Sequence, residues 1–326
     1  MARTKSDKSV WIIFFEALKI FCLNIHKFLL YMTFPVLGQV VGIFLIFGLS
    51  YWFNNNVDMI VKKYPIIDNV SMMSVAVLVL TLPGLLIFVK AFWEYLVAYV
   101  ALNSMAEGAV STGRVYDFPA HNAVVYNRKF TFIMLWLLFG IFTLIASFPL
   151  LWIIGGILFI YFVLIFQVFT FEDGISATGC FKRSITLIKG KFARTAVLMF
   201  GLIGLFYLLF KGTTVLFEVV NLNRFFLEIF ETWAMTLPLN EVNAILSIIK
   251  MEITPLMVAE ACRENVTLFI AFGFLLPLRS IAWTLWYKNL NNNTMVCENT
   301  PKKQRKTARK KLDKNILKRA MQEDDE

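Results

Sequence analysis

Long apolar segments alternate with short basic segments along this chain of 326 residues. Six of the apolar segments reach the ~20 residues that an α-helix needs to cross ~30 Å of hydrocarbon. Inside a bilayer every backbone N–H and C=O group must be bonded within its own segment, so this pattern predicts helices. The six predicted spans are 28–53, 71–90, 130–148, 151–171, 196–217 and 266–287.

The composition supports a membrane protein, because 58% of the residues are hydrophobic and only 17% are charged. A soluble domain of this size needs more polar surface to cover its core. We therefore predict an all-α fold, a polytopic membrane helix bundle of six transmembrane helices. The predicted organisation is a cytoplasmic N-terminus with an interfacial helix (1–27), a six-span membrane domain (28–290) and a polybasic cytoplasmic tail (291–326).

A short basic segment precedes the first, third and fifth spans. These segments are 16–28, 119–130 and 179–192, and each ends in the dipeptide Lys-Phe. A lysine at a span entrance can reach the lipid phosphates while the phenylalanine begins the hydrocarbon segment. The pattern predicts three units, each an amphipathic interfacial helix followed by a pair of spans, although short basic caps can also recur by chance.

The third of these segments has the clearest helical periodicity. Its apolar positions recur at spacings of three and four, which is typical of an amphipathic helix that lies in the headgroup plane. The predicted apolar face consists of Ala177, Phe181, Ile185, Ile188 and Phe192, and the opposite face of Lys182, Arg183, Thr186 and Lys189.

The distribution of Lys and Arg predicts the orientation. With the N-terminus in the cytoplasm, every segment rich in basic residues falls on the same side of the membrane, as the positive-inside rule requires. We therefore expect a bacterial cytoplasmic (inner) membrane protein with both termini in the cytoplasm. The long connection 218–265 then lies outside, where two amphipathic segments, 222–233 and 239–253, are expected to rest on the leaflet or cap the bundle.

Anionic phospholipid headgroups of the bilayer are the expected partners of the basic residues. Clusters of Lys and Arg beside a span attract anionic lipids by ~1 kcal/mol per charge. A nucleic-acid partner is not expected, because the basic tail has no aromatic platform beside it. The predicted headgroup contacts are Lys27, Lys129, Lys182, Arg183, Lys189, Lys191, Lys302, Lys303, Arg305 and Lys306.

Charged residues within or near the spans are the other candidates for function. Lys90 and Glu94 lie four residues apart near the end of the second span, and Arg279 interrupts the sixth. They are candidates for an intramembrane polar site. The alternative is that Arg279 is paired structurally or extends to the membrane surface, as does Lys211 in the fifth span.

The sequence offers little for catalysis. His26 and His121 are the only histidines, which excludes H-E-x-x-H zinc sites and His-rich metal clusters. Neither a phosphate-binding P-loop nor a G-x-S-x-G nucleophile motif is present. We therefore expect no catalytic residue, no metal and no cofactor, and a protein that is not an enzyme.

Two segments resemble a known group of bacterial membrane proteins. "EDGISATGCFKRSITLIKGKFART" (172–195) is similar to the helix that precedes a span in these proteins, and "LPLRSIAWTLWYKNL" (276–290) is similar to the close of their last span. The group includes the membrane domain of some glycerophosphoryl diester phosphodiesterases and many uncharacterised six-span relatives. The resemblance implies a six-helix membrane domain and carries over no catalytic residue.

The leading hypothesis is a non-enzymatic membrane protein that organises lipids or partner proteins. The alternative is a transporter or lipid-handling protein that uses a polar site inside the bundle. A third hypothesis, a membrane subunit associated with an enzyme, depends on the resemblance alone.

Overall fold

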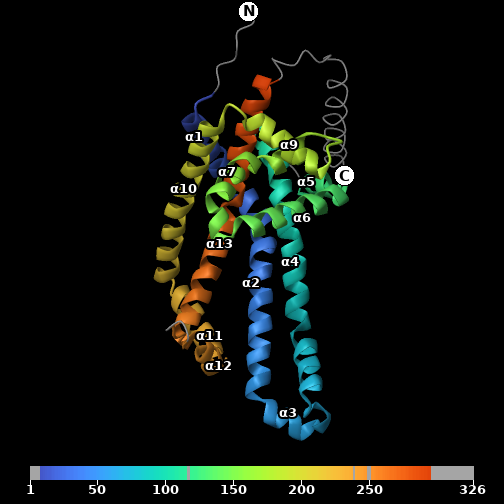
Figure 1. The fold of residues 1–326 in the computed structure, drawn as a ribbon, viewed down its shortest axis with the longest axis vertical. Helices are drawn as coiled ribbons and strands as arrows, with labels where there is room; N and C mark the ends of the chain where they lie inside the picture. Colours follow the sequence, from blue (N-terminus) through green and yellow to red (C-terminus); the bar gives the residue numbers. More distant parts are fainter. Residues whose placement is uncertain (1–7, 116–117, 238, 248–250, 295–326) are drawn as a thin grey trace, which may run out of the picture. The chain divides into compact units, whose positions relative to one another are not determined.

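The computed structural model of the protein describes residues 8–115, 118–237, 239–247 and 251–294 (Figure 1). Over these residues the ordered elements are helices, and no strand is found. The α-helices are α1 (Val10–Leu23), α2 (Ile25–Asn55), α3 (Val57–Lys63), α4 (Val70–Thr112), α5 (Phe118–Tyr126), α6 (Lys129–Ala146), α7 (Trp152–Phe162), α8 (Ile165–Phe171), α9 (Ala177–Ile188), α10 (Phe192–Val219), α11 (Leu222–Ala234), α12 (Leu239–Leu246) and α13 (Pro255–Thr294). Two 3-10 helices, η1 (Pro65–Ile67) and η2 (Pro149–Leu151), connect them, so the predicted all-α fold is confirmed.

Six helical segments are long and apolar enough to cross a membrane, and each contains or closely matches one predicted span. They are Ile25–Asn55, Ser71–Thr112, Lys129–Ala146, Pro149–Phe171, Phe192–Val219 and Pro255–Asn291. Contacts group Lys8–Tyr287 into one unit, and the description below concerns that unit. The tail from residue 295 onwards, with Lys302, Lys303, Arg305 and Lys306, lies outside the described residues.

The three short helices expected before spans are present as α1, α5 and α9. They precede α2, α6 and α10 respectively. Between α9 and α10 the chain turns at Gly190, whose φ of 80° is a left-handed conformation that glycine adopts at no steric cost. The Lys-Gly-Lys-Phe sequence at this point therefore ends one helix and begins the next.

Helices α2 and α4 pack closely along their length (Figure 1). Small residues make the approach possible: a Cβ atom on Gly42 would lie 2.7 Å from the backbone nitrogen of Phe88, and one on Gly84 would lie 2.9 Å from the carbonyl oxygen of Gly42. Gln39, which lies beside Gly38 in α2, donates to the carbonyl oxygen of Pro35 in its own helix at 2.7 Å.

Helix α4 extends far beyond the predicted end of the second span at residue 90. Its continuation is buried on one face, where Ala91, Val97, Ala101 and Met105 are fully inaccessible. This face packs against α5 and α8. The hydropathy criterion missed the continuation because Lys90 and Glu94 interrupt the apolar run, although they leave the helix intact.

The fourth predicted span is divided into two helices. Pro149 lies between the third and fourth spans, and within the fourth span helix α7 ends at Phe162 and α8 begins at Ile165. Val163 and Leu164 lie between them, and neither is a proline or a glycine. The sequence therefore contains no helix-breaking residue that would predict this interruption.

The buried face of α9 differs from the predicted one. Ala177 and Ile188 are buried as expected, but Ile185 is 38% exposed and Ser184 is fully inaccessible. The hydroxyl of Ser184 donates to the carbonyl oxygen of Tyr161 at 2.6 Å, which satisfies its polar group within the core. The predicted face of α9, defined by its large apolar residues alone, is therefore rotated relative to the face that is buried in the structure.

The connection 218–265 contains α11 and α12, as the periodicity predicted. Phe226, Phe230 and Ala259 form a buried cluster that joins α11 to the beginning of α13. Phe44 of α2 stacks on both phenylalanines, with ring centroids 5.5 Å apart in each pair. Helix α11 therefore packs against the second half of α2.

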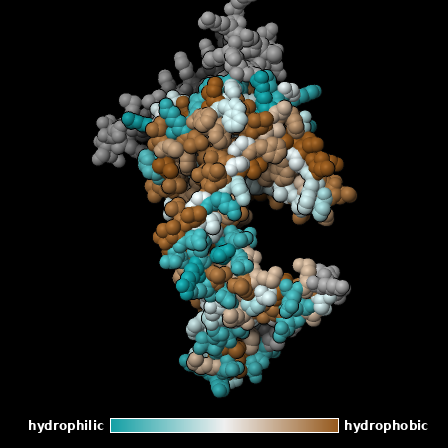
Figure 2. All heavy atoms as spheres, turned by 90° about the vertical axis from the view of Figure 1, so that its left-hand side faces the viewer, coloured by the Kyte–Doolittle hydropathy of each residue, from teal (hydrophilic) through white to brown (hydrophobic). Residues whose placement is uncertain are grey.

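Large apolar side chains are exposed on the outside of the bundle, as expected of helices in lipid. Phe200, Tyr207 and Val215 of α10 are each more than half exposed. Figure 2 shows hydrophobic side chains gathered over a broad area, with hydrophilic side chains beyond it. An apolar surface of this extent marks a membrane or protein contact.

Candidate functional site

The three residues predicted to form an intramembrane polar site do not form one ion-paired cluster. Lys90 and Glu94 pair with each other within α4, with Nζ and Oε1 3.4 Å apart. The Lys90 side chain is 66% exposed, so this pair lies at the surface of the bundle. Arg279 of α13 lies elsewhere, with its guanidinium carbon 4.6 Å from the centre of the Tyr99 ring.

Arg279 has no anionic partner among the residues that the structure describes. The Tyr99 ring attracts the guanidinium through its π face. No ion pair or hydrogen bond joins Arg279 to another described side chain. The charge is thus held by aromatic rings, which leaves its N–H donors available.

Arg279 lines a cavity of about 300 Å³. The walls come from α6 to α8 on one side and from α10 and α13 on the other. Apart from Arg279, every lining residue is apolar or aromatic: Phe139, Phe159, Phe162, Val163, Phe166, Met199, Leu202, Ile203, Phe206, Phe272 and Trp283. The interruption between α7 and α8 lies in this wall, at Val163.

An aromatic cluster surrounds the Tyr99 ring beside Arg279, at one wall of the cavity. Tyr99 packs edge-to-face on Phe166 and on Trp136, with ring centroids 4.7 and 5.2 Å apart. The indole N–H of Trp136 is buried and has no hydrogen-bond partner in the structure. The cluster therefore fixes the position of the Tyr99 ring that holds Arg279.

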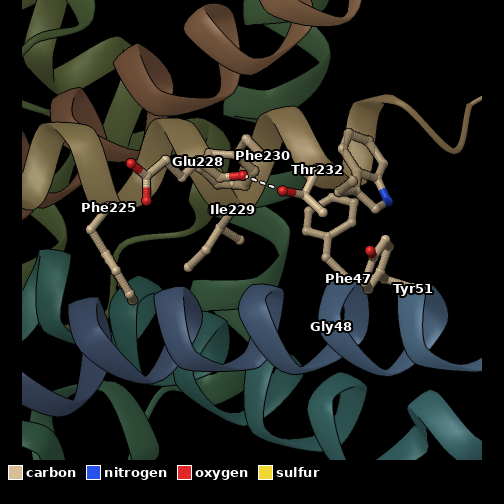
Figure 3. Close-up of a pocket in the computed structure, with 9 residues that line it drawn as sticks. Phe47, Gly48, Tyr51, Phe225, Glu228, Ile229, Phe230 and Thr232 are labelled. Carbon is tan, nitrogen blue, oxygen red and sulfur yellow. Dashed lines mark hydrogen bonds between the residues drawn. The ribbon is translucent and has the colours of Figure 1, made fainter.

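A second cavity, of about 320 Å³, lies between α2 and α11 (Figure 3). Phe47 and Tyr51 rise from α2 towards α11, and Phe225 descends from α11 towards α2. The charge at this cavity is already compensated, because Glu228 accepts from Nε of Arg224 at 2.8 Å. The two cavities are thus similar in volume and different in electrostatics.

A polar cluster connects the two segments that carry the family resemblance. One oxygen of Glu172, which lies between α8 and α9, accepts from Nε of Arg183 at 2.9 Å and from the hydroxyl of Tyr287 at 2.8 Å. The carboxylate thereby ties α9 to α13. We call Glu172, Arg183 and Tyr287, with Arg128, the entrance latch.

Arg128 at the beginning of α6 is the most connected member of the entrance latch. Its guanidinium donates to the carbonyl oxygens of Phe169, Glu172 and Ile175 at 2.7, 3.1 and 2.8 Å. It also lies 4.5 Å from the centre of the Phe169 ring. The bonds to Phe169 and Glu172 satisfy carbonyl groups at the end of α8, which have no partner within the helix, and the bond to Ile175 holds the segment that leads into α9.

The entrance latch changes the role of one predicted headgroup contact. Arg183 is partly buried in its ion pair with Glu172 and is not a free cation at the surface. The pairing is possible because Glu172 lies just before α9, and it leaves the Arg183 side chain 22% exposed. Lys27, Lys129, Lys182 and Lys189 are exposed, whereas Lys191 is half-buried.

The span entrances gather at one end of the unit. The Tyr31 hydroxyl, near the beginning of α2, donates to Asn122 of α5. Nδ1 of His121 lies 3.0 Å from the hydroxyl of Ser104 on the last part of α4. Through α5, these contacts join the entrance of α2 to the last part of α4, and the bonds of Arg128 join the entrance of α6 to the segment before α9.

The Cys180 thiol is expected to be unreactive in the folded protein. Burial raises its pKa to about 11, Arg128 acts in the opposite direction, and Glu172 adds to the rise. Since the thiolate is the reactive form, only about one thiol in a thousand is ionised at pH 8. Maleimide labelling followed by peptide mass spectrometry should show Cys180 reacting far more slowly than exposed Cys22, and faster as the pH approaches 11. Equal rates at pH 8 would contradict the buried position of Cys180.

The described residues contain no group of three or more His, Cys, Asp or Glu side chains that could hold a metal ion. Comparisons of the chain with protein-family models, with curated proteins and with solved structures found no match. The class of protein that the fold defines is therefore a membrane-embedded bundle of six apolar helices.

Proposed function

We propose that this protein is a non-enzymatic membrane protein that binds anionic phospholipid headgroups at the surface where its short helices lie. The observation that carries the proposal is the exposure of Lys27, Lys129 and Lys182. The first two lie at span entrances and the third on α9, the short helix before the fifth span. Each contributes ~1 kcal/mol of attraction to an anionic surface.

The entrance latch supports the proposal because it fixes Lys129 of α6 and Lys182 of α9 relative to one another. Arg128 and Glu172 join α6, α9 and α13 through bonds of 2.7 to 3.1 Å. The lysines therefore approach the headgroups from a rigid scaffold, so less side-chain and backbone entropy is lost on binding.

The proposed surface is the cytoplasmic face of a bacterial inner membrane, with both termini on the same side. The positive-inside rule supports this orientation, because the basic segments before three spans and the basic tail then share one compartment. Lipid organisation by this face would require no catalytic residue.

A matched pair of triple variants tests headgroup binding. We expect Lys27→Gln, Lys129→Gln and Lys182→Gln together to reduce retention of phosphatidylglycerol over phosphatidylcholine, by a factor of about five for each lysine. The control carries Lys62→Gln, Lys63→Gln and Lys211→Gln, which remove three exposed lysines from α3 and α10. Native mass spectrometry of protein from mixed vesicles gives the ratio. Equal loss in both variants, or in neither, would refute the proposal.

A second candidate function, the handling of a lipid or solute inside the bundle, is favoured by one observation. Arg279 has no anionic partner among the described residues and lines a cavity. Flux across proteoliposome membranes that falls on Arg279→Gln would support transport. Absence of flux across a broad panel of solutes would leave binding as the role of the cavity.

The resemblance to the membrane domain of some glycerophosphoryl diester phosphodiesterases leads to a separate proposal, association with a soluble enzyme. The segments that carry the resemblance meet at Glu172, through Arg183 and Tyr287. Reproducible co-purification with a soluble phosphodiesterase would support this association, and purification of the chain alone would count against it.

A further inference from the structure

The charge of Arg279 is the starting point of a further inference. A charged side chain at the centre of a membrane helix costs ~2.5 to 3.5 kcal/mol on insertion. Such residues normally pair with another charged group, but the described residues supply Arg279 with aromatic rings alone. The guanidinium can donate five hydrogen bonds in a planar fork that matches a carboxylate. An anion is therefore the missing complement of this site.

The dimensions of the cavity limit the ligand. Its volume of about 300 Å³ is roughly twice the ~150 Å³ of an engineered protein cavity that binds benzene. Along α13 its wall extends from Phe272 to Trp283, about three helical turns or ~16 Å. An elongated space of this volume accommodates one alkyl chain, and a lipid with two chains exceeds it.

The walls define how such a chain would lie. Arg279 and Trp283 are close together in sequence at one end of the α13 wall, and Phe272 lies two turns away towards the other end. Phe206 of α10 packs edge-to-face on Phe272, with centroids 5.8 Å apart. The polar group of a ligand would therefore lie at Arg279, with its chain directed towards these two phenylalanines.

A route from the bilayer is visible in the exposure of the lining residues. Ile203 lines the cavity and is also 54% exposed on the outer surface of α10. On the same helix Phe200 is 63% exposed. The cavity wall is thus continuous with the apolar outer surface, so an amphiphile can enter from the lipid phase.

We propose that this cavity binds a single-chain anionic amphiphile, a fatty carboxylate from the bilayer, whose carboxylate pairs with Arg279. This inference rests on the second candidate function, a site inside the bundle, and is independent of headgroup binding by the lysines. The cavity between α2 and α11 provides the contrast: Arg224 and Glu228 compensate each other there, so it should not prefer an anion.

Tryptophan quenching by brominated amphiphiles tests the proposal, because Trp283 lines the cavity. The probes are 12-bromododecanoate and the uncharged 12-bromododecanol, titrated at pH 8 into purified protein in a non-ionic detergent. We expect the carboxylate to bind at least tenfold more tightly than the alcohol, which corresponds to about 1.4 kcal/mol. Quenching should fall in Trp283→Phe, which assigns it to this cavity.

Two variants identify the charge responsible. Arg279→Gln should abolish the preference for the carboxylate while the alcohol still binds. Lys211→Gln is the matched control: Lys211 also lies over a tyrosine ring, that of Tyr207 at 5.6 Å, but does not line the cavity. The control should retain the preference.

The outcomes distinguish the inference of an anionic ligand from the broader proposal of a binding site inside the bundle. If carboxylate and alcohol bind the wild-type protein equally in the Trp283-dependent signal, the cavity takes a lipid chain and the inference of an anionic ligand is wrong. If neither probe quenches Trp283, the inference and the site inside the bundle both fail. The comparison of the two probes requires only the wild-type protein and Trp283→Phe, so it decides the question even if Arg279→Gln does not fold.

Discussion

Replacing Arg128 with methionine is expected to lower the free energy of unfolding by about 3 kcal/mol or more. The substitution keeps a long apolar side chain but removes three bonds from a charged donor to the carbonyl oxygens of Phe169, Glu172 and Ile175. Each such bond contributes about 1.5 to 3 kcal/mol, and carbonyl groups left without a partner add to the loss. Unfolding by SDS in mixed micelles, followed by circular dichroism, measures the change.

The neighbouring residue provides the control for this prediction. Lys129→Met removes a positive charge one residue later, but Lys129 is exposed and outside the entrance latch. Its effect should stay within about 0.5 kcal/mol, as is usual for surface substitutions. Similar losses in both variants would mean that charge at this position, rather than the bonds of Arg128, stabilises the protein.

The second large effect is expected from Gly42→Leu, which should prevent α2 and α4 from packing. The new Cβ alone would lie 2.7 Å from the backbone nitrogen of Phe88, and backbone cannot move away as a side-chain end can. Overpacking of this kind costs about 1 to 3 kcal/mol or more. We expect a sharp fall in folded, detergent-extractable protein, measured by size-exclusion chromatography.

Gly48→Leu is the matched control on the same helix. No atom lies within 4 Å of a Cβ built on Gly48, which faces the cavity shown in Figure 3. Leucine also has a higher helix propensity than glycine, so this variant should be at least as stable as the wild type. If Gly48→Leu lost as much folded protein as Gly42→Leu, the close contact of α2 with α4 would not be the cause.

The spans and the short helices before them could be predicted from the sequence because both follow from local pattern. A run of apolar residues near 20 long has few alternatives to a transmembrane helix, and a basic segment ending in Lys-Phe marks a span entrance. The local pattern did not predict that α4 continues beyond Lys90. That part of the helix is stabilised by burial against α5 and α8, which is a tertiary effect.

The long-range contacts of the site also could not be predicted from the sequence. Glu172 and Tyr287 are far apart along the chain and meet only when α13 packs beside α9. Arg279 was recognised as unusual for its charge, but its grouping with Lys90 and Glu94 relied on their shared position near one membrane face. The fold places Arg279 on the Tyr99 side of α4 instead. The interruption at Val163 had no proline or glycine to reveal it.

We expect the entrances to the first, third and fifth spans to lie at one membrane surface. This expectation is tested most directly by labelling single cysteines introduced at Lys27, Lys129 and Lys182, with Met59 of α3 as the reference for the opposite surface. The chain used has its four native cysteines replaced by alanine, is reconstituted in one orientation into vesicles, and is exposed to a membrane-impermeant quencher of the attached fluorophore. We predict that the three entrance positions are quenched from the same side and position 59 only from the other, because α2 is about 46 Å long and separates them. Quenching of any one entrance position together with position 59 would contradict the account.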